Sequence, residues 1–235
     1  LHTQPDMALL FADVIPEMKQ LKSLRMDWCI NTITQELDTE VGVWLAPIVQ
    51  QCTLLTELEL SISHKDVPRF IPALLPLQNL EHLLLYGHPS FSSLPSAFYD
   101  LHFPHLTLFK TSMTIGGEDL SAFGDWLACH PGLTHLHLAF TFEFIDQSLE
   151  TLSTCPSLYL LAIRYMHDEP LGEFWIRRLP PTLRRLTLNS DLEAELPSDH
   201  QLTHFQQEVF PNNIRRHQTL VELHTDWSAL FWPSV

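Results

Sequence analysis

The sequence predicts an α/β solenoid, a fold in which short parallel strands stack into one sheet and helices cover one of its faces. Leucine occupies 43 of the 235 positions, whereas glycine occupies 7. A six-residue motif with apolar residues at its first, fourth and sixth positions recurs along the chain. Segments between these motifs carry apolar residues at helical spacing. Self-similarity of this kind is typical of repeat architectures, in which each unit packs against the next.

The repeated motif has the form Leu-x-x-Leu-x-Leu, with Met, Phe, Thr or Ile at some apolar positions. Five of its seven successive intervals measure 25 to 27 residues, within the roughly 20–29 residues of leucine-rich repeats. We therefore expect a horseshoe like that of ribonuclease inhibitor, with about eight parallel strands on its concave face and helices on its convex face. The motifs begin at Leu21, Leu55, Leu80, Leu106, Leu133, Leu158, Leu183 and Leu220.

The motif also predicts which side chains are buried, because alternate side chains of a strand point to opposite faces of a sheet. The fourth and sixth positions should enter the core. The third and fifth positions should face outwards, as should the residue that follows the motif, which we number as its seventh position. In the motif that begins at Leu133, this places Leu136 and Leu138 inside and His135 and His137 outside. The outward residues can vary between repeats without disturbing the core, so they form the expected recognition surface.

The segments between the strands predict helices that pack on the sheet. Leu120, Phe123, Trp126 and Leu127 fall on one helical stripe, and residues 171–179 show a similar spacing. The two long intervals predict helices over residues 39–52 and 201–217, and apolar residues within 227–232 are expected to cap the last repeat. Neither interval resembles a Gly/Ser-rich linker, so we expect a single domain over residues 1–235.

The charge and composition of the chain disfavour several classes of protein. Acidic residues number 28 against 13 Lys and Arg, and the net charge of −15 argues against nucleic-acid and anionic-membrane partners. No apolar run approaches the roughly 20 residues that cross a bilayer. Four scattered cysteines do not match the disulfide framework of a small secreted module. We therefore expect reduced thiols and a cytoplasmic or nuclear protein.

One stretch of the chain resembles the cysteine-containing leucine-rich repeats of F-box proteins. Residues 144–163 read FIDQSLETLSTCPSLYLLAI, and the family pattern runs strand, Ile-Thr/Ser-Asp, helix, then Cys-Pro-x-Leu into the next strand. Cys52 and Cys129 precede other motifs in similar contexts, and LPPTL at 179–183 is similar to repeats of fungal members of this group. The residues that match the pattern are Ile145, Asp146, Leu149, Leu152, Cys155, Pro156 and Leu158.

The resemblance implies the substrate-binding part of an F-box-like ubiquitin-ligase receptor, which presents a bound target for ubiquitin transfer by other subunits. The F-box, a short helical module that docks the adaptor of a cullin ligase, is not seen here, because residues 1–20 are too few to supply it. Binding of that adaptor would depend on an F-box upstream of Leu1. The alternative is a stand-alone leucine-rich-repeat scaffold or inhibitor with no ubiquitin link.

The sequence contains no catalytic or cofactor-binding motif of the common types, so we expect neither enzyme activity nor a cofactor. A zinc site is the alternative role for the cysteines and histidines, because thiolates and imidazoles are good zinc ligands. The cysteines, however, precede different strands and form no C-x-x-C pair. His135 and His137 point the same way, but His82 lies two strands distant, at roughly 10 Å. We therefore expect no metal, and buried apolar thiols.

The candidate binding site is the middle of the predicted concave face. Outward positions of the five middle repeats include no acidic residue, although the chain as a whole is strongly acidic. Aromatic and Arg side chains are typical of binding hot spots. The alternative is an ordinary solvated face, because scattered apolar residues are normal on surfaces. The candidate residues are His82, Leu84, Tyr86, Leu108, Lys110, His135, His137, Leu160, Arg164 and Arg185.

Different residues of this surface have different expected roles. Tyr86 and Leu108 are expected to be the apolar anchors of a protein partner. Lys110, Arg164 and Arg185 are expected to select an acidic or phosphorylated segment, because Arg binds carboxylate and phosphate groups with two parallel hydrogen bonds.

Overall fold

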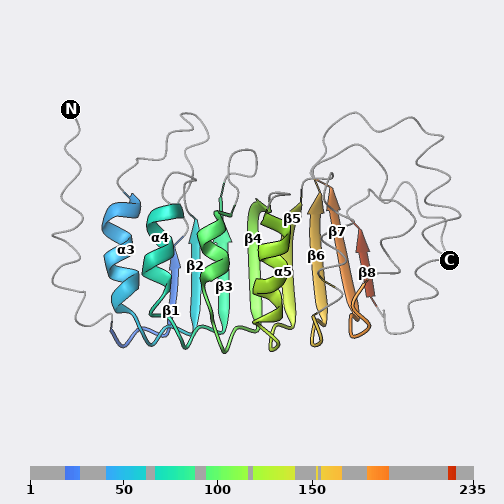
Figure 1. Cartoon of the computed structure of the whole chain (residues 1–235), viewed down its shortest axis with the longest axis horizontal. Helices are drawn as coiled ribbons and strands as arrows, with labels where there is room; N and C mark the ends of the chain where they lie inside the picture. The colour runs from blue at the N-terminus through green and yellow to red at the C-terminus, as the bar shows by residue number, and fades with distance from the viewer. Residues whose placement is uncertain are drawn as a thin grey trace, which may run out of the picture.

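Each leucine motif forms a strand, as the computed structural model of the chain shows (Figure 1). Every strand begins two residues after the first leucine of its motif. The structure describes residues 19–26, 41–61, 67–87, 94–115, 119–140, 152, 155–165, 179–190 and 222–225. The strands are β1 (Ser23–Met26), β2 (Glu57–Ser61), β3 (His82–Tyr86), β4 (Leu108–Ile115), β5 (His135–Phe140), β6 (Leu160–Tyr165), β7 (Arg185–Ser190) and β8 (Glu222–Thr225).

The eight strands form one sheet in chain order, from β1 at one edge to β8 at the other. All seven neighbouring pairs are parallel. Their register aligns equivalent motif positions, so that Leu58, Leu83, Phe109 and Leu136 lie side by side across four strands. The predicted single sheet of about eight parallel strands is confirmed, and the sheet is not closed into a barrel.

Three α-helices among the described residues cover one face of the sheet (Figure 1). They are α3 (Val41–Gln51), α4 (Val67–Leu74) and α5 (Leu120–Ala128), and a 3₁₀ helix, η1 (Ser96–Asp100), lies between β3 and β4. The helix predicted at 39–52 corresponds to α3. The helix predicted at 201–217, the capping residues 227–232 and nearly all of the helical segment at 171–179 lie outside the described residues.

The core lies between the helices and the sheet. In α5, the four apolar residues predicted to form one stripe are all buried. In α4, Val67, Phe70, Ile71 and Leu74 form an equivalent buried stripe, at the spacing of one helical face. The fourth and sixth motif positions supply the sheet side of the core, and they include the buried residues Leu58, Leu60, Leu83, Leu85, Phe109, Leu136, Leu138, Leu161 and Leu186.

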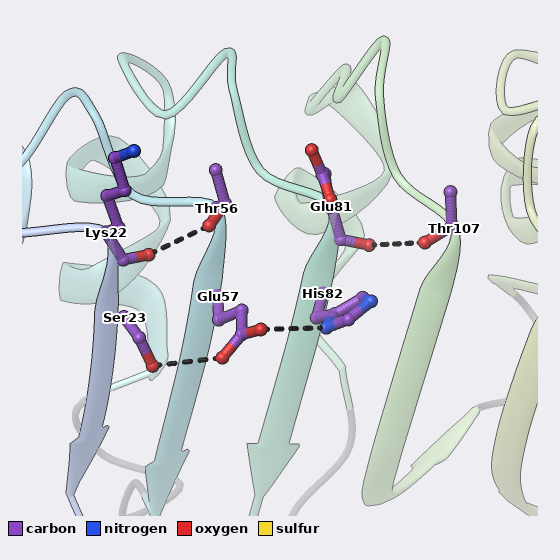
Figure 2. Close-up of polar contacts among 7 residues, drawn as sticks. All are labelled: Lys22, Ser23, Thr56, Glu57, Glu81, His82 and Thr107. Atoms are coloured by element: carbon purple, nitrogen blue, oxygen red, sulfur yellow. Dashed lines mark hydrogen bonds and ion pairs between the residues drawn. The ribbon is translucent and has the colours of Figure 1, made fainter.

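A ladder of backbone hydrogen bonds joins successive repeats just before each strand. The carbonyl of Lys22 accepts hydrogen bonds from the N–H groups of Thr56 and Glu57, at 2.8 and 3.0 Å. The same two-to-one arrangement recurs at the carbonyls of Thr56, Glu81, Thr107, Thr134 and Tyr159. Three threonines at the second motif position add a side-chain bond to this carbonyl: Thr56 to Lys22, Thr107 to Glu81 and Thr134 to Thr107. Figure 2 shows the first two of these bonds.

We expect the double variant Thr56→Val/Thr107→Val to lower the free energy of unfolding by about 1–2 kcal/mol. Valine keeps the branched shape of threonine but removes the hydroxyl that donates to the preceding repeat, and a net hydrogen bond contributes about 0.5–1.5 kcal/mol. The two sites are separated by one strand, so their effects should nearly add. Urea unfolding measures the change. Thr187→Val in β7 is the control, and an equal loss in that variant would contradict the assigned role of the ladder.

Candidate functional site

The candidate residues lie on five neighbouring strands, β3 to β7. Their motif positions are the third, fifth and seventh, which alternate with the buried fourth and sixth positions. They therefore belong to the sheet face opposite α3, α4 and α5, which we call the open face. Among the side chains that the structure describes, all except that of Leu160 are partly exposed on this face.

The strand register arranges eight of the ten candidate residues in two rows, and the other two, Tyr86 and Arg164, lie at seventh motif positions. The first row runs across the sheet through His82, Leu108, His135, Leu160 and Arg185. The second row, two residues further along each strand, places Leu84, Lys110 and His137 next to one another. Neighbouring strands lie about 4.8 Å apart, so adjacent members of a row are within contact distance. The structure thus brings these eight residues together in one continuous surface.

Lys110 is held on this surface by an aromatic ring rather than by an acid. Its ammonium group lies 5.3 Å from the centroid of the Tyr86 ring, which is within the range of a cation–π interaction. Among the described residues, no carboxylate forms an ion pair with Lys110. The positive charge of Lys110 therefore remains available to a negatively charged group in solution.

Two acidic residues of the open face, Glu57 and Glu59, lie on β2 and have partners on neighbouring strands, as Figure 2 shows for Glu57. Glu57 accepts a hydrogen bond from Ser23 at 3.0 Å and lies 3.5 Å from Nδ1 of His82. Glu59 pairs with Arg25 at 3.2 Å. The open face is thus divided: its amino-terminal edge carries paired acids, and its centre carries Lys110 without one.

Two histidines next to Lys110 are held in the neutral form. Burial lowers the pKa of His137, and the nearby positive charge of Lys110 and the neighbouring His135 add to this effect. Together they bring the pKa to about 4. Burial also lowers the pKa of His135, with added contributions from His82 and Arg185. Both effects have ordinary causes, since burial and nearby positive charges disfavour a second cation. At neutral pH these imidazoles act as uncharged hydrogen-bonding groups.

The expected role of Leu160 as an exposed apolar contact is corrected by the structure. Its side chain is 8% exposed, although it lies at an outward motif position. Leu160 lies on β6, and its register neighbours are His135 on β5 and Arg185 on β7. These long side chains flank Leu160, so it supports the surface more than it contacts a partner. For Arg164, the strand position is described and the side chain lies outside the described residues.

Two further residues belong to this surface: Tyr159, which the motif did not place there, and Ser112, which lies at a seventh motif position and faces outwards as predicted. Tyr159 is 43% exposed, and its ring centroid lies 6.0 Å from that of His135. It occupies the second motif position, where six of the other seven repeats carry a polar or charged residue and none carries an aromatic one, so an aromatic residue at this position was the available signal. Ser112 accepts a hydrogen bond from the N–H of Gly87 and donates one to its carbonyl, both at 2.9 Å.

The Ser112 contact belongs to an irregularity in the sheet. Between Lys110 and Thr114, β4 spans four residues, while β5 spans two between their partners His137 and Ala139. The extra residues of β4 keep the alternation of buried and partly exposed side chains, and the buried Thr111 hydroxyl accepts a hydrogen bond from the N–H of Met113 at 3.0 Å. The irregularity lies directly beside Lys110 and His137, so the centre of the open face is also where the strand register changes.

The cysteines do not follow one rule. Cys52 and Cys155 are buried and form no disulfide, and burial raises the pKa of the Cys155 thiol to about 11 and that of Cys52 above its usual value. Cys129 is also free but exposed, so the expectation of a buried thiol is wrong there. His130 takes the buried position instead. Cys29 lies outside the described residues.

The described residues contain neither a cluster of metal-binding side chains nor a helix that could span a membrane. No three His, Cys, Asp or Glu side chains within the described ranges lie close enough to share a metal ion. In the same part of the chain, no helix is long and apolar enough to cross a membrane.

Comparison with known proteins does not assign this chain to a family. No protein family model matches it, and no curated protein is similar to it in sequence. Its class is accordingly defined by the fold and by the open face: a parallel α/β sheet in solenoid order, with a continuous surface of aromatic, apolar and basic side chains.

Proposed function

We propose that this chain is a leucine-rich-repeat domain that recognises a protein partner through the open face of its sheet, without catalysing a reaction. The observation that carries the proposal is the repeated strand geometry. Equivalent motif positions lie side by side across the sheet, and the same carbonyl ladder joins each repeat to the next. A rigid row of variable side chains on a constant frame is how repeat proteins build extended binding surfaces.

In this proposal the sheet is curved and the open face is concave. Packed helices need about 8–10 Å between their axes, whereas paired strands need about 4.8 Å. A stack of strand–helix units is therefore longer on its helical side, which bends the sheet away from the helices. Such a horseshoe would surround a partner on the face that carries Tyr86 and Lys110.

The chemistry of the open face supports a protein partner. Tyr86 and Leu84 supply apolar area, Lys110 supplies a charge, and His135 and His137 supply hydrogen-bonding groups. Protein interfaces combine aromatic anchors with polar groups in this way. A partner that covered these side chains would remove apolar area from water and would gain a charge contact at Lys110.

We also propose that the domain is the substrate-binding part of an F-box-like ubiquitin-ligase receptor. This finer proposal rests on the resemblance at residues 144–163. Cys155 is buried immediately before β6, which is compatible with the Cys-Pro-x-Leu pattern. A stand-alone scaffold or inhibitor is the alternative, and it would use the open face in the same way. Co-purification of a cullin adaptor with the natural full-length protein supports the receptor, and recovery of partners without that adaptor supports the scaffold.

Affinity capture with quantitative mass spectrometry tests the site. We expect the double variant Tyr86→Ala/Lys110→Glu to recover at least tenfold less of the partner than the unmodified chain does. Truncation of a hot-spot residue commonly costs more than about 1 kcal/mol, and the second change also reverses the charge at the centre of the site. The melting temperature should remain nearly unchanged, because both side chains lie on the surface.

Arg69→Glu is the matched control, because it makes the same charge change on α4, on the covered side of the sheet. It should leave capture intact. Loss of the partner with Arg69→Glu, together with full capture by the open-face variant, would move the binding site to the helical side. Equal recovery by all three proteins would contradict the proposed use of the open face.

A further inference from the structure

The centre of the open face has a feature that protein recognition alone does not require. A permanent cation, Lys110, lies beside an uncharged histidine, His137, in neighbouring strands and in direct register. We propose that the partner places a carboxylate of an acidic segment between Lys110 and His137, and that His137 takes up a proton from solvent when this carboxylate binds. This inference rests on the proposed function and adds the chemistry of the partner and its dependence on pH.

The first support for this inference is the position of Lys110. The Tyr86 ring holds the ammonium group 5.3 Å from its centroid, and within the described part of the chain no acid pairs with it. The nearest acids of the open face, Glu57 and Glu59, have partners of their own on β1 and β3. An arriving carboxylate would therefore find a preoriented cation and little competition.

The second support is the full set of groups that face His137. From β4 it faces Lys110, and from its own strand it faces His135. From β6 its register partner is Ala162, which carries no charge. Beyond these, Arg185 on β7 and His82 on β3 act on His135. Every described neighbour is thus basic or uncharged, and burial acts in the same direction.

A bound carboxylate would reverse this balance. Without it, burial and Lys110 hold the pKa of His137 at about 4. An opposite charge within hydrogen-bonding distance favours the charged form of a titrating group by about 1–3 pKa units. The imidazolium then donates a hydrogen bond to one carboxylate oxygen while Lys110 binds the carboxylate electrostatically. Because the complex binds more protons than the free protein, binding must become tighter as the pH falls.

The spacing of the cations favours an extended acidic segment over a single phosphate group. Lys110 lies on β4 and Arg185 on β7, three strands apart and offset by two residues along the strands. This corresponds to about 16 Å between their backbone positions, a gap that the two long side chains can narrow. One phosphate cannot reach both. Two carboxylates four residues apart in an extended chain span about 13 Å. The outward side chains between the two cations come from β5 and β6 and are uncharged at neutral pH: His135, His137, Leu160 and Ala162. The intervening residues of the segment should therefore be uncharged.

The test uses the peptide acetyl-Glu-Leu-Ala-Leu-Glu-amide as the probe, at millimolar concentration, with its Gln counterpart as the uncharged control. NMR titration of the intact chain follows the His137 ring signals. We expect the Glu peptide to raise the pKa of His137 by one unit or more, and the Gln peptide to leave it unchanged. A rise of two units corresponds to about tenfold tighter binding at pH 5 than at pH 7, a range in which the Glu carboxylates stay largely ionised.

Two variants assign the effect to its residues. His137→Gln should bind the Glu peptide with the same affinity at pH 5 and pH 7, because it cannot take up the proton. Lys110→Met should weaken binding at both pH values at least fivefold. His105→Gln, at an exposed turn, is the matched control and should keep the full pH dependence. Melting temperatures of all three variants verify that the fold is intact.

Three outcomes overturn the inference. They are a pKa of His137 that the Glu peptide does not change, a pH dependence that persists in His137→Gln, and at least tenfold tighter binding of a phosphoserine peptide, which would assign a phosphorylated segment instead. The proposed function fails separately: it falls if captured partners ignore the Tyr86→Ala/Lys110→Glu variant. If the Tyr86→Ala/Lys110→Glu variant captures less partner but the amount captured does not change with pH, the proposed function stands and the inference about His137 is wrong.

Discussion

Replacing Trp126 by alanine is expected to lower the free energy of unfolding by about 4 kcal/mol. Trp126 is 1% exposed and lies at the centre of an aromatic cluster. Its ring centroid is 5.1 Å from that of Phe109 on β4, 5.3 Å from Phe98 in η1 and 6.1 Å from Phe123 in α5. The cluster joins a strand to two helical elements, so the cavity left by alanine cannot close by a small local shift. Chemical unfolding measures the loss.

Trp126→Phe separates packing from hydrogen bonding at this position. The indole Nε1 is buried, and the structure gives it no hydrogen-bond partner among the described residues, so removing it also removes a desolvation cost. We therefore expect Trp126→Phe to lower the free energy of unfolding by about 1 kcal/mol or less. Leu75→Ala, at a side chain that is 55% exposed, is the control for a surface truncation. A loss with Trp126→Phe as large as that with alanine would show that the indole nitrogen has a partner.

The second large effect is expected at His130, where leucine should lower the free energy of unfolding by about 2 kcal/mol. His130 is 3% exposed, and its Nε2 accepts a hydrogen bond from the backbone N–H of Phe103 at 3.0 Å. That assigns the proton to Nδ1, which lies 2.6 Å from the carbonyl oxygen of Trp126. Leucine leaves the buried Phe103 N–H without a partner, which costs about 1–3 kcal/mol.

Steric misfit does not explain this expected loss, because the same repeat position accepts leucine elsewhere. Before β3, Leu77 occupies this position and is fully buried. The carbonyl of Leu77 accepts a hydrogen bond from the N–H of Leu80, and the carbonyl of His130 accepts the equivalent bond from the N–H of Leu133. The matched control is His102→Leu, on the exposed neighbour of Phe103, which should change stability by less than about 0.5 kcal/mol. An unchanged stability for His130→Leu would contradict the role of the Phe103 hydrogen bond.

His130 should also make stability depend on pH. Burial lowers its pKa below the usual 6.5 and His102 lowers it further, while the bond to the Trp126 carbonyl acts in the opposite direction. Below pH 6.5 the unfolded chain therefore binds a proton that the folded chain excludes. The contribution of His130 to stability is complete above pH 6.5 and is lost as the pH falls from 6.5 towards the folded pKa. The difference in stability between the unmodified chain and His130→Leu should shrink over that range.

The buried half of each strand could be predicted from the sequence because burial follows a simple period. Leu136 and Leu138 are buried and His135 and His137 are partly exposed, as the alternation requires. The helical stripe of α5 was equally predictable, because its spacing alone places Trp126 inside. Both patterns depend on residues close in sequence, which is the range over which periodicity carries information.

Exceptions arose where residues far apart in sequence decided the outcome. Leu160 is buried at an outward position because it lies between His135 and Arg185 on two other strands. Cys129 lies four residues before its motif, whereas Cys52 and Cys155 lie three residues before theirs, so His130 takes the buried position and Cys129 is exposed. His130 is tolerated there because Phe103, 27 residues earlier, presents an N–H to it. A local sequence pattern cannot predict a hydrogen-bond partner that lies 27 residues away.

The sequence by itself determined the repeat, the positions of the strands and the residues that face outwards, because these depend on the period of apolar side chains. The tertiary structure alone decided which outward residues act together. It placed Lys110 over Tyr86 and beside His137, and it paired Glu57 and Glu59 with neighbours at the edge of the sheet. The physical reason is that a charge acts through the groups that surround it in space, and the register of parallel strands brings those groups together from repeats about 25 residues apart.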